Sequence, residues 1–196
     1  EDFITAPPVV AGGRVFTLDA RAGVGAFDAL TGAPVWRVDL DPKVRRDRKG
    51  FGGGVAYADG KLFVASGFRF VAMLDAATGA VIWRTPVDSE IHAAPTVSAG
   101  RVFVVSTSNK LLAFDAATGR PGWEYQALIE PARILQATTP AVSGEAVVAA
   151  FASGELVAMQ ANNGTELWSK PLIRANRNNA LSELRDISGR PVIYRG

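Results

Sequence analysis

The residue types that most often carry chemistry are sparse in this chain of 196 residues. His92 is the one histidine, and there is no cysteine. A transition-metal site built from imidazole and thiolate ligands therefore lacks donors. A Ser-His-Asp set would have to use His92, and nothing in the sequence singles out such a group around it. Thiol nucleophiles and disulfides are excluded as well. We therefore predict no catalytic residue, no metal site and no bound cofactor.

Two short stretches resemble ligand-binding segments. The glycine run at residues 52–54 precedes an expected strand, whereas a phosphate-binding loop leads into a helix and usually carries a Lys-Ser/Thr pair. A tight loop entering a strand is the better interpretation. The basic run of residues 43–49 is interpreted as a solvated loop, with an acidic partner or a lipid surface as the alternative. The net charge of +2 gives no argument for nucleic acid.

One grouping favours protein binding. Leu184, Arg185 and Asp186 lie in residues 173–189, a segment that mixes polar and apolar side chains. An apolar anchor beside an arginine is typical of the residues that dominate interface energies. The alternative is that the leucines of this segment fold back on the neighbouring strands.

The elements that position these residues follow from an internal repeat. The pattern Asp-Ala-x-Thr-Gly-x-x-x-Trp occurs at residues 28–36, 75–83 and 115–123, and a degenerate copy at 160–168 keeps the Ala, the Gly and the Trp. A strand of alternating character precedes each copy. The aspartate can accept a hydrogen bond from an amide two residues on, and the glycine supplies the positive φ of a turn with a bulge. Each copy is therefore predicted to be a β-hairpin whose second strand carries the tryptophan.

The tryptophans predict that the hairpins stack, because one hairpin cannot bury an indole alone. Two more strands precede each copy, which makes four strands per repeat. The tryptophans recur at intervals of 40 to 47 residues, the period of β-propeller blades. We assign blade docking to the four tryptophans and to the glycine four residues before each: Trp36, Trp83, Trp123 and Trp168, with Gly32, Gly79, Gly119 and Gly164.

We predict an all-β chain that forms a single partial β-propeller domain of four-stranded antiparallel blades, without helices. The expected blades span about 6–40, 53–87, 93–127 and 138–172, and the first strand of a further blade spans 190–196. That extra strand favours an arc of a larger propeller over a closed four-bladed disc. The open edges of an arc invite pairing with another chain, including a second copy.

The three longest connections should gather on one face, because successive blade-to-blade connections of a propeller all emerge on the same side. They are residues 41–52, 127–137 and 173–189. Long loops on a rigid scaffold are where binding usually takes place.

The repeat resembles the tryptophan-docked repeat of the pyrroloquinoline quinone (PQQ)-like propeller superfamily. Residues 50–54 (GFGGG) and 184–192 (LRDISGRPV) are in addition similar to the BamB family of propeller lipoproteins, in its α-proteobacterial form. The resemblance covers essentially the whole chain and implies a non-enzymatic propeller of about eight blades. It also implies a lipid-anchored, periplasmic component of the outer-membrane β-barrel assembly machinery (the BAM complex). No run of apolar residues is long enough for a transmembrane helix, and we expect the natural chain to begin upstream of Glu1, with the lipid anchor.

The resemblance also implies a partner, the POTRA domains of the barrel-inserting subunit BamA, and nascent outer-membrane proteins as further partners. Two neighbouring loops make the contact in that family. Asp186, five residues before Pro191, matches the first aspartate of one loop, while Ser188 stands at the position of the second. The other loop corresponds to residues 131–136, offset in register. The protein-binding residues implied are Leu184, Arg185, Asp186, Arg133 and Ile134.

Two other functions stay open at this point. A PQQ-dependent dehydrogenase would hold the quinone over Ca²⁺ with a vicinal cysteine pair and a tryptophan floor, but this chain has no cysteine and its tryptophans are assigned to docking. A propeller that senses or binds a small ligand is the third possibility. Because a shared fold does not carry activity, we favour the non-enzymatic scaffold.

Overall fold

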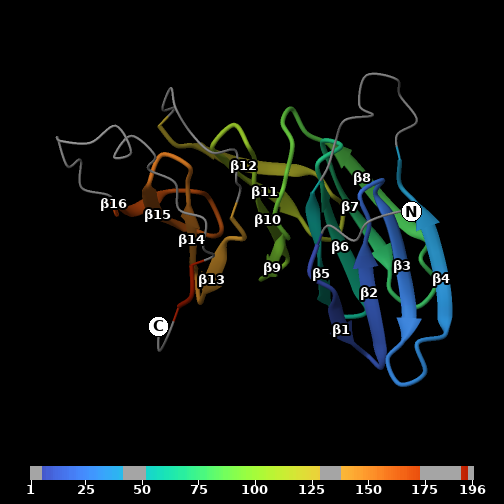
Figure 1. Ribbon diagram of the computed structural model, residues 1–196. Helices are drawn as coiled ribbons and strands as arrows, with labels where there is room; N and C mark the ends of the chain where they lie inside the picture. The colour runs from blue at the N-terminus through green and yellow to red at the C-terminus, as the bar shows by residue number, and fades with distance from the viewer. Residues whose placement is uncertain (1–5, 42–51, 129–137, 173–190, 194–196) are drawn as a thin grey trace.

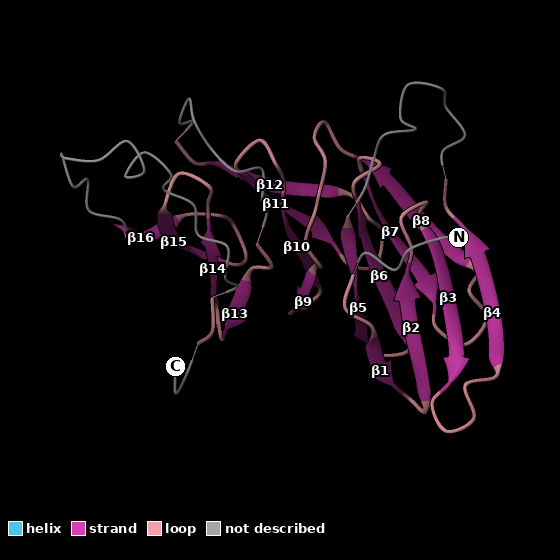
Figure 2. Cartoon of the chain, viewed as in Figure 1, coloured by secondary structure: helices cyan, strands magenta, loops and turns pink. Residues whose placement is uncertain are grey.

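A computed structural model describes residues 6–41, 52–128, 138–172 and 191–193 of the chain. In these ranges the regular structure is entirely β-strand, arranged as four separate antiparallel sheets (Figures 1 and 2). Each sheet has four strands that pair in the order of the sequence. The prediction of four-stranded antiparallel sheets without helices is confirmed for the described residues.

The strands of the first two sheets have the following bounds. Sheet 1 contains β1 (Val9–Ala11), β2 (Arg14–Leu18), β3 (Gly23–Asp28) and β4 (Pro34–Asp39). Sheet 2 contains β5 (Gly53–Ala58), β6 (Lys61–Ser66), β7 (Phe70–Asp75) and β8 (Val81–Pro86).

The second half of the chain repeats this arrangement. Sheet 3 contains β9 (Thr96–Ser98), β10 (Arg101–Val105), β11 (Lys110–Asp115) and β12 (Pro121–Gln126). Sheet 4 contains β13 (Ala141–Ser143), β14 (Ala146–Ala150), β15 (Glu155–Gln160) and β16 (Glu166–Pro171). The expected strand at 190–196 lies largely outside the described residues, and residues 191–193, which are described, form no strand.

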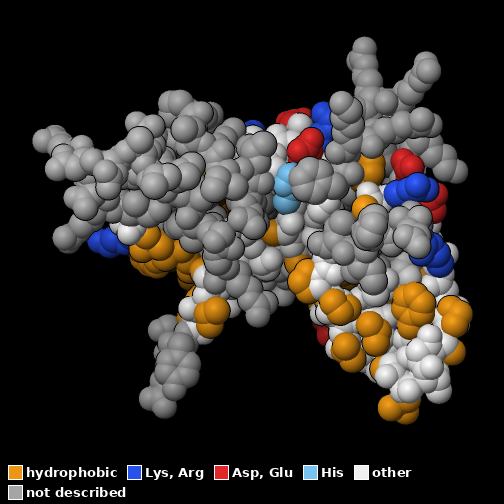
Figure 3. Space-filling model, in the orientation of Figure 1, with side chains coloured by type: hydrophobic (Ala, Val, Ile, Leu, Met, Phe, Trp, Pro, Cys, Tyr) orange, Lys and Arg blue, Asp and Glu red, His pale blue; other side chains and the backbone are white. Residues whose placement is uncertain are grey.

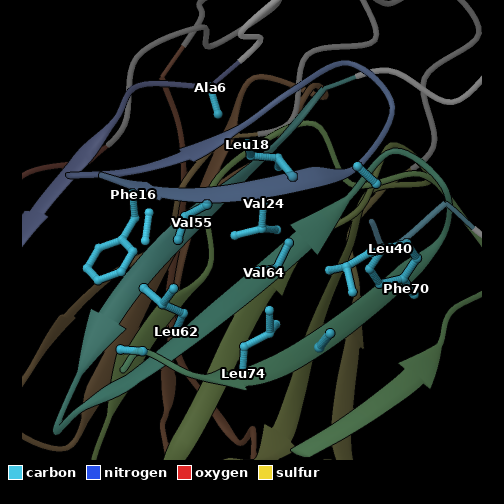
Figure 4. Close-up of a cluster of buried hydrophobic side chains, with 14 of the residues drawn as sticks. Ala6, Phe16, Leu18, Val24, Leu40, Val55, Leu62, Val64, Phe70 and Leu74 are labelled. Atoms are coloured by element: carbon cyan, nitrogen blue, oxygen red, sulfur yellow. The ribbon is translucent and has the colours of Figure 1, made fainter. Parts of the chain in front are cut away.

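The four sheets form an arc. The first strands β1, β5, β9 and β13 are neighbours along its inner side, and the fourth strands lie toward the outside (Figure 1). The middle strands of sheet 2 are covered by sheet 1 on one face and by sheet 3 on the other, which is why β6 and β7 are almost continuously apolar and buried. The outer strand β8 instead alternates between exposed and partly buried residues. Figure 4 shows the core between sheets 1 and 2, where Phe16 and Val24 face Leu62 and other residues of sheet 2.

The turns between third and fourth strands form as the repeat predicts. The Asp28 carboxylate accepts hydrogen bonds from the Thr31 amide and the Thr31 hydroxyl, both at 2.8 Å, and the Gly32 φ is +70°. The bond from the Thr31 amide is the largest cause of a lowered pKa at Asp28. At Asp75 a hydrogen bond from the Lys61 ammonium is the largest cause, and the pKa falls to about 2. In every sheet the pairing between the third and fourth strands contains a bulge, which bends the strand there.

The fourth turn keeps its backbone without the aspartate. The Gly164 amide still donates to the Gln160 carbonyl at 2.8 Å, and the Gly164 φ is +75°. The Asn163 side chain accepts a bond from the Thr165 amide, as the Thr31 hydroxyl accepts one from the Ala33 amide in the first turn. The glycine is therefore the feature that this turn cannot lose.

Each of the first three tryptophans docks on the hairpin of the following sheet. The Trp36 Nε1 donates to the Ala76 carbonyl at 3.1 Å, and Trp83 and Trp123 make the equivalent bonds to Ala116 and Ala161 at 3.0 Å. Behind each indole lies a phenylalanine of the same sheet, with ring centroids 5.9 to 6.3 Å apart. These aromatic pairs and the indole hydrogen bond join consecutive sheets.

The docking glycines are required by space as well as by φ. A Cβ atom on Gly79 would lie 2.8 Å from the Trp36 ring, and one on Gly119 would lie 2.5 Å from the Trp83 ring. Gly164 has the same relation to Trp123. Gly32 is the exception, because no atom lies within 4 Å of the position that its Cβ would take.

Trp168 occupies the equivalent place in β16, but no described sheet follows it. Its side chain is 41% exposed, and no acceptor for its indole N–H is found among the described residues. Val148 stands where the other three sheets have the buried phenylalanine.

We expect Gly119→Ala to destabilise the fold far more than Gly100→Ala. Both glycines have φ of +71°, but Gly100 has open space around its Cβ position and Gly119 faces Trp83. The positive φ costs each variant about 1 kcal/mol, and overpacking costs Gly119→Ala about 1–3 kcal/mol more. Urea unfolding of both variants measures the difference, and equal losses would contradict the docking role of Gly119.

Candidate binding surface

The described ends of all the long connections lie on one face of the arc. The residue after each fourth strand donates its amide to a turn between second and third strands: Leu40 to Ala22, Val87 to Arg69, Ala127 to Asn109 and Leu172 to Gly154, at 2.9 to 3.1 Å. We call the face formed by these turns and strand ends the loop face. The opposite face, formed by the turns between third and fourth strands, is the hairpin face.

The far ends of two connections return to the same face. The Gly52 carbonyl accepts a bond from the Gly67 amide, in the turn between β6 and β7. The Thr138 hydroxyl donates to the Ala150 carbonyl at the loop-face end of β14. Both segments therefore leave from and return to the loop face, in line with the sequence analysis.

The predicted binding residues are not placed individually. Arg133 and Ile134 belong to residues 129–137, and Leu184, Arg185 and Asp186 belong to residues 173–190; both segments lie outside the described residues, as does the basic run at 43–49. The segments start after Leu128 and Leu172, which lie two residues beyond the end of β12 and one residue beyond the end of β16, on neighbouring sheets. The structure thus brings their starting points to adjacent sheets on one face.

Two exposed leucines mark this region, and the sequence analysis did not single them out. The Leu128 residue is 70% exposed and Leu172 is 55% exposed. Each lies within two residues of the end of a fourth strand, the strand that carries the tryptophan of its repeat, so its position in the repeat is the signal that could have identified it. Exposed apolar residues beside long connections are suited to contact with a partner.

A buried asparagine holds the chain where it leaves sheet 3. The Asn109 side-chain amide donates to the Leu128 carbonyl at 3.0 Å. The Gln126 amide group donates to the carbonyls of Ser108 and Asn109 at 3.0 and 3.2 Å. Asn109 has a φ of +59°, which asparagine tolerates better than most residues. This network fixes the backbone of Leu128 against the turn between β10 and β11.

Several charged side chains on the loop face of sheets 1 and 2 make contacts within the fold. The Asp19 carboxylate is buried, accepts the Gly23 amide at 2.7 Å, and pairs with Arg37 at 2.6 Å. The Arg84 guanidinium lies 3.9 Å from the centroid of the Phe70 ring, a cation–π contact. These groups serve to close turns and cover the core.

Two acidic residues, Glu155 at the start of β15 and Glu166 at the start of β16, act on Tyr125 at the boundary between sheets 3 and 4. The Tyr125 hydroxyl donates to Glu166 at 3.1 Å, across the boundary between sheets 3 and 4. Burial, followed by this bond, raises the pKa of Tyr125 to about 12. Burial and then repulsion from Glu166 raise the pKa of Glu155, whose Oε2 is buried without a hydrogen-bond partner among the described residues.

His92 lies 3.5 Å from Glu90 in an ion-pair arrangement. Within residues 6–41, 52–128, 138–172 and 191–193, no set of three or more His, Cys, Asp or Glu residues is arranged to hold a metal ion. The described part of the chain also contains no helix that is long and apolar enough to cross a membrane.

Replacing Asn109 by Gly should cost about 1 kcal/mol of unfolding free energy, because it removes the bond to the Leu128 carbonyl while keeping a backbone that accepts positive φ. Gly154 already serves at the equivalent turn of sheet 4. The matched control is Asn162→Gly, in the exposed turn between β15 and β16. Chemical denaturation of both variants provides the measurement. If Asn109→Gly lowered the unfolding free energy no more than Asn162→Gly does, the hydrogen bond from Asn109 to the Leu128 carbonyl would contribute nothing to stability.

Glu155→Gln should stabilise the protein at neutral pH. A carboxyl whose pKa is higher in the folded than in the unfolded state loses stabilisation as the pH rises through the folded pKa. The neutral glutamine removes this loss, so we expect a modestly higher Tm at about pH 7 and a difference that shrinks toward about pH 4. Glu145→Gln, an exposed site in the β13–β14 turn, is the control. A Tm difference that is constant with pH would contradict the assignment.

The sequence matches the profile of one family, described as outer membrane protein assembly factor BamB, over residues 20–196. It is 28% identical over 187 residues to the outer membrane protein assembly factor BamB of Burkholderia pseudomallei, a match that covers 95% of this chain and 47% of that protein. The relative from Shewanella oneidensis is 27% identical, with 95% of this chain and 49% of that protein covered. The chain thus spans about half the length of the curated relatives it matches.

Solved structures agree on the fold. The crystal structure of BamB from Moraxella catarrhalis superposes with a TM-score of 0.83 at 18% identity, covering 100% of this chain and 58% of that one. A quinohemoprotein alcohol dehydrogenase from Comamonas testosteroni has a TM-score of 0.69 at 19% identity, with 86% and 35% covered. The predicted propeller fold is confirmed, and these similarities concern the fold alone.

Proposed function

This chain belongs to the family of the outer membrane protein assembly factor BamB, and from that premise we propose that it is a non-enzymatic scaffold that binds a protein partner through its loop face. The observation that carries the proposal is the family match over residues 20–196. The proposed setting is the periplasmic face of the outer membrane, where a lipid anchor would hold the full-length protein.

The proposed partner is the POTRA region of a BamA-like subunit. The loop face suits a folded partner because it combines a rigid sheet framework with exposed apolar anchors, Leu128 and Leu172, next to the segments that carry the candidate residues. Interfaces of this kind owe their affinity to a few apolar and arginine side chains. Arg133, Ile134, Leu184, Arg185 and Asp186 are the residues proposed to complete the contact.

A dehydrogenase role has one observation in its favour, the fold that the chain shares with the quinohemoprotein alcohol dehydrogenase. Fold alone does not carry activity, and the chain contains no cysteine from which a vicinal pair could be made. Trp36, Trp83 and Trp123 are engaged in docking between sheets. The scaffold is therefore the better supported function.

We expect Leu128→Asp and Leu172→Asp each to weaken capture of a purified POTRA region by about tenfold or more, because each places a charge where an apolar anchor would be desolvated. Asp186→Arg and Leu184→Ala should weaken it in the same assay. Leu30→Asp is the matched control, since Leu30 is 96% exposed in the turn after β3, on the hairpin face. Binding is measured by biolayer interferometry, and circular dichroism confirms that each variant is folded.

Two results would count against the scaffold. If all four variants bound the POTRA region as tightly as the unsubstituted chain does, the loop face would not be the docking surface. A saturable change in tryptophan fluorescence on adding PQQ and Ca²⁺, accompanied by alcohol oxidation, would favour the dehydrogenase instead.

A further inference from the structure

The boundary between sheets 1 and 2 contains an open pocket on the hairpin face. Its volume is about 230 Å³, and all of its lining residues belong to the described part of the chain. Figure 3 shows apolar side chains over the lower end of sheet 1, where the β1–β2 turn lies. The lining includes Gly12, Arg14 and Phe16 from sheet 1 and Tyr57, Ala76 and Ala77 from sheet 2.

Tyr57 gives this boundary an aromatic wall that the next two boundaries lack. Val97 and Val142 hold the same strand position in sheets 3 and 4 and pack into the cores there. The Tyr57 ring stacks on Phe16, with ring centroids 6.0 Å apart and an interplanar angle of 15°. Tyr57 is 37% exposed, and its hydroxyl makes no hydrogen bond within the described residues. Because Gly12 has no side chain, the space beside this hydroxyl stays open.

Arg14 brings to the pocket a positive charge that pairs with no carboxylate of the described residues. In sheet 2 the basic residue at the same strand position, Lys61, pairs with the Asp75 carboxylate of its own sheet at 2.9 Å. Arg14 instead reaches across to sheet 2, where its Nη1 donates to the carbonyls of Ala76 and Ala77 at 2.8 Å. Its Nη2 and Nε groups have no acceptor among the described residues. The two carbonyls thus hold the guanidinium in place while donors remain for an anion.

We propose that this pocket binds a small aromatic carboxylate. The carboxylate accepts hydrogen bonds from the Arg14 guanidinium and the Tyr57 hydroxyl, and the ring packs against Tyr57 beside Gly12. A guanidinium favours a planar anion that accepts two hydrogen bonds, and an aromatic wall favours a flat apolar group. The pocket is smaller than sites for drug-sized ligands, which start at about 300 Å³, so the ligand class is a single ring that carries one carboxylate.

Phenylacetate, titrated into the isotope-labelled chain and followed by NMR, tests the proposal. We expect saturable amide shifts around the pocket, at Gly12, Gly60 and Ala77, with a dissociation constant on the order of 1 mM, as suits so small a ligand. Phenylacetamide, which carries no charge, and acetate, which has no ring, should each bind about tenfold or more weakly. The pocket lies on the hairpin face, so this result is independent of the proposed docking on the loop face.

Three variants examine the walls of the pocket separately. Tyr57→Val introduces the residue type of sheets 3 and 4 and should weaken phenylacetate binding about three- to tenfold, through loss of the stacking and of the hydroxyl. Arg14→Gln should weaken it about tenfold or more, because the charge-assisted bonds are lost. Gly12→Asn should block the pocket, since asparagine tolerates a positive φ and its side chain would point toward Tyr57.

Arg101→Gln, at the position of Arg14 in sheet 3, is the matched control and should leave phenylacetate binding unchanged. Circular dichroism shows whether each variant is folded, and if Arg14→Gln is not, Tyr57→Val and Gly12→Asn decide the outcome. An absence of saturable shifts around the pocket would overturn the proposal. Equal binding of phenylacetate and phenylacetamide would overturn it too, as would binding that the folded pocket variants leave unchanged.

Discussion

The indole hydrogen bond between one sheet and the hairpin of the next is the interaction on which this architecture depends. Burying Trp36, Trp83 or Trp123 requires an acceptor for its N–H, and that acceptor is an alanine carbonyl whose position is set by the following turn. That hairpin turn requires a glycine, which can adopt a positive φ and has no Cβ. Local turn geometry and the stacking of sheets are therefore coupled, repeat by repeat.

This coupling leaves the two faces of the arc with different roles. On the hairpin face the repeat specifies most residues, because each turn must receive the indole of the sheet before it. On the loop face the repeat specifies little beyond the amide that joins each fourth strand to its neighbouring turn. The connections can therefore vary in length without disturbing the stack, and partner contacts can be built there.

The outer flanks of sheets 1 and 4 differ from the inner boundaries in the same contact. In a stack whose stability comes from nearest-neighbour contacts, a terminal repeat exposes the half-contact that an inner repeat would cover. Among the described residues, Trp168 and the Ala29–Gly32 hairpin are the two half-contacts that no described sheet covers. Val148, in place of a phenylalanine, leaves Trp168 without the aromatic neighbour that the other indoles have.

The amino-acid sequence by itself determined the hairpins, the four strands of each repeat and the places of the tryptophan and the glycine within it, because these follow from local spacing. It also indicated that the long connections share a face. Only the tertiary structure decided that each of the first three tryptophans packs against the glycine of the next repeat. The tertiary structure also decided that Leu128 and Leu172 are exposed and that the Asn109 side chain binds the Leu128 carbonyl. These features depend on which residues, distant in the chain, meet at the boundaries of the sheets, and a periodic pattern carries no information about contacts that only one copy makes.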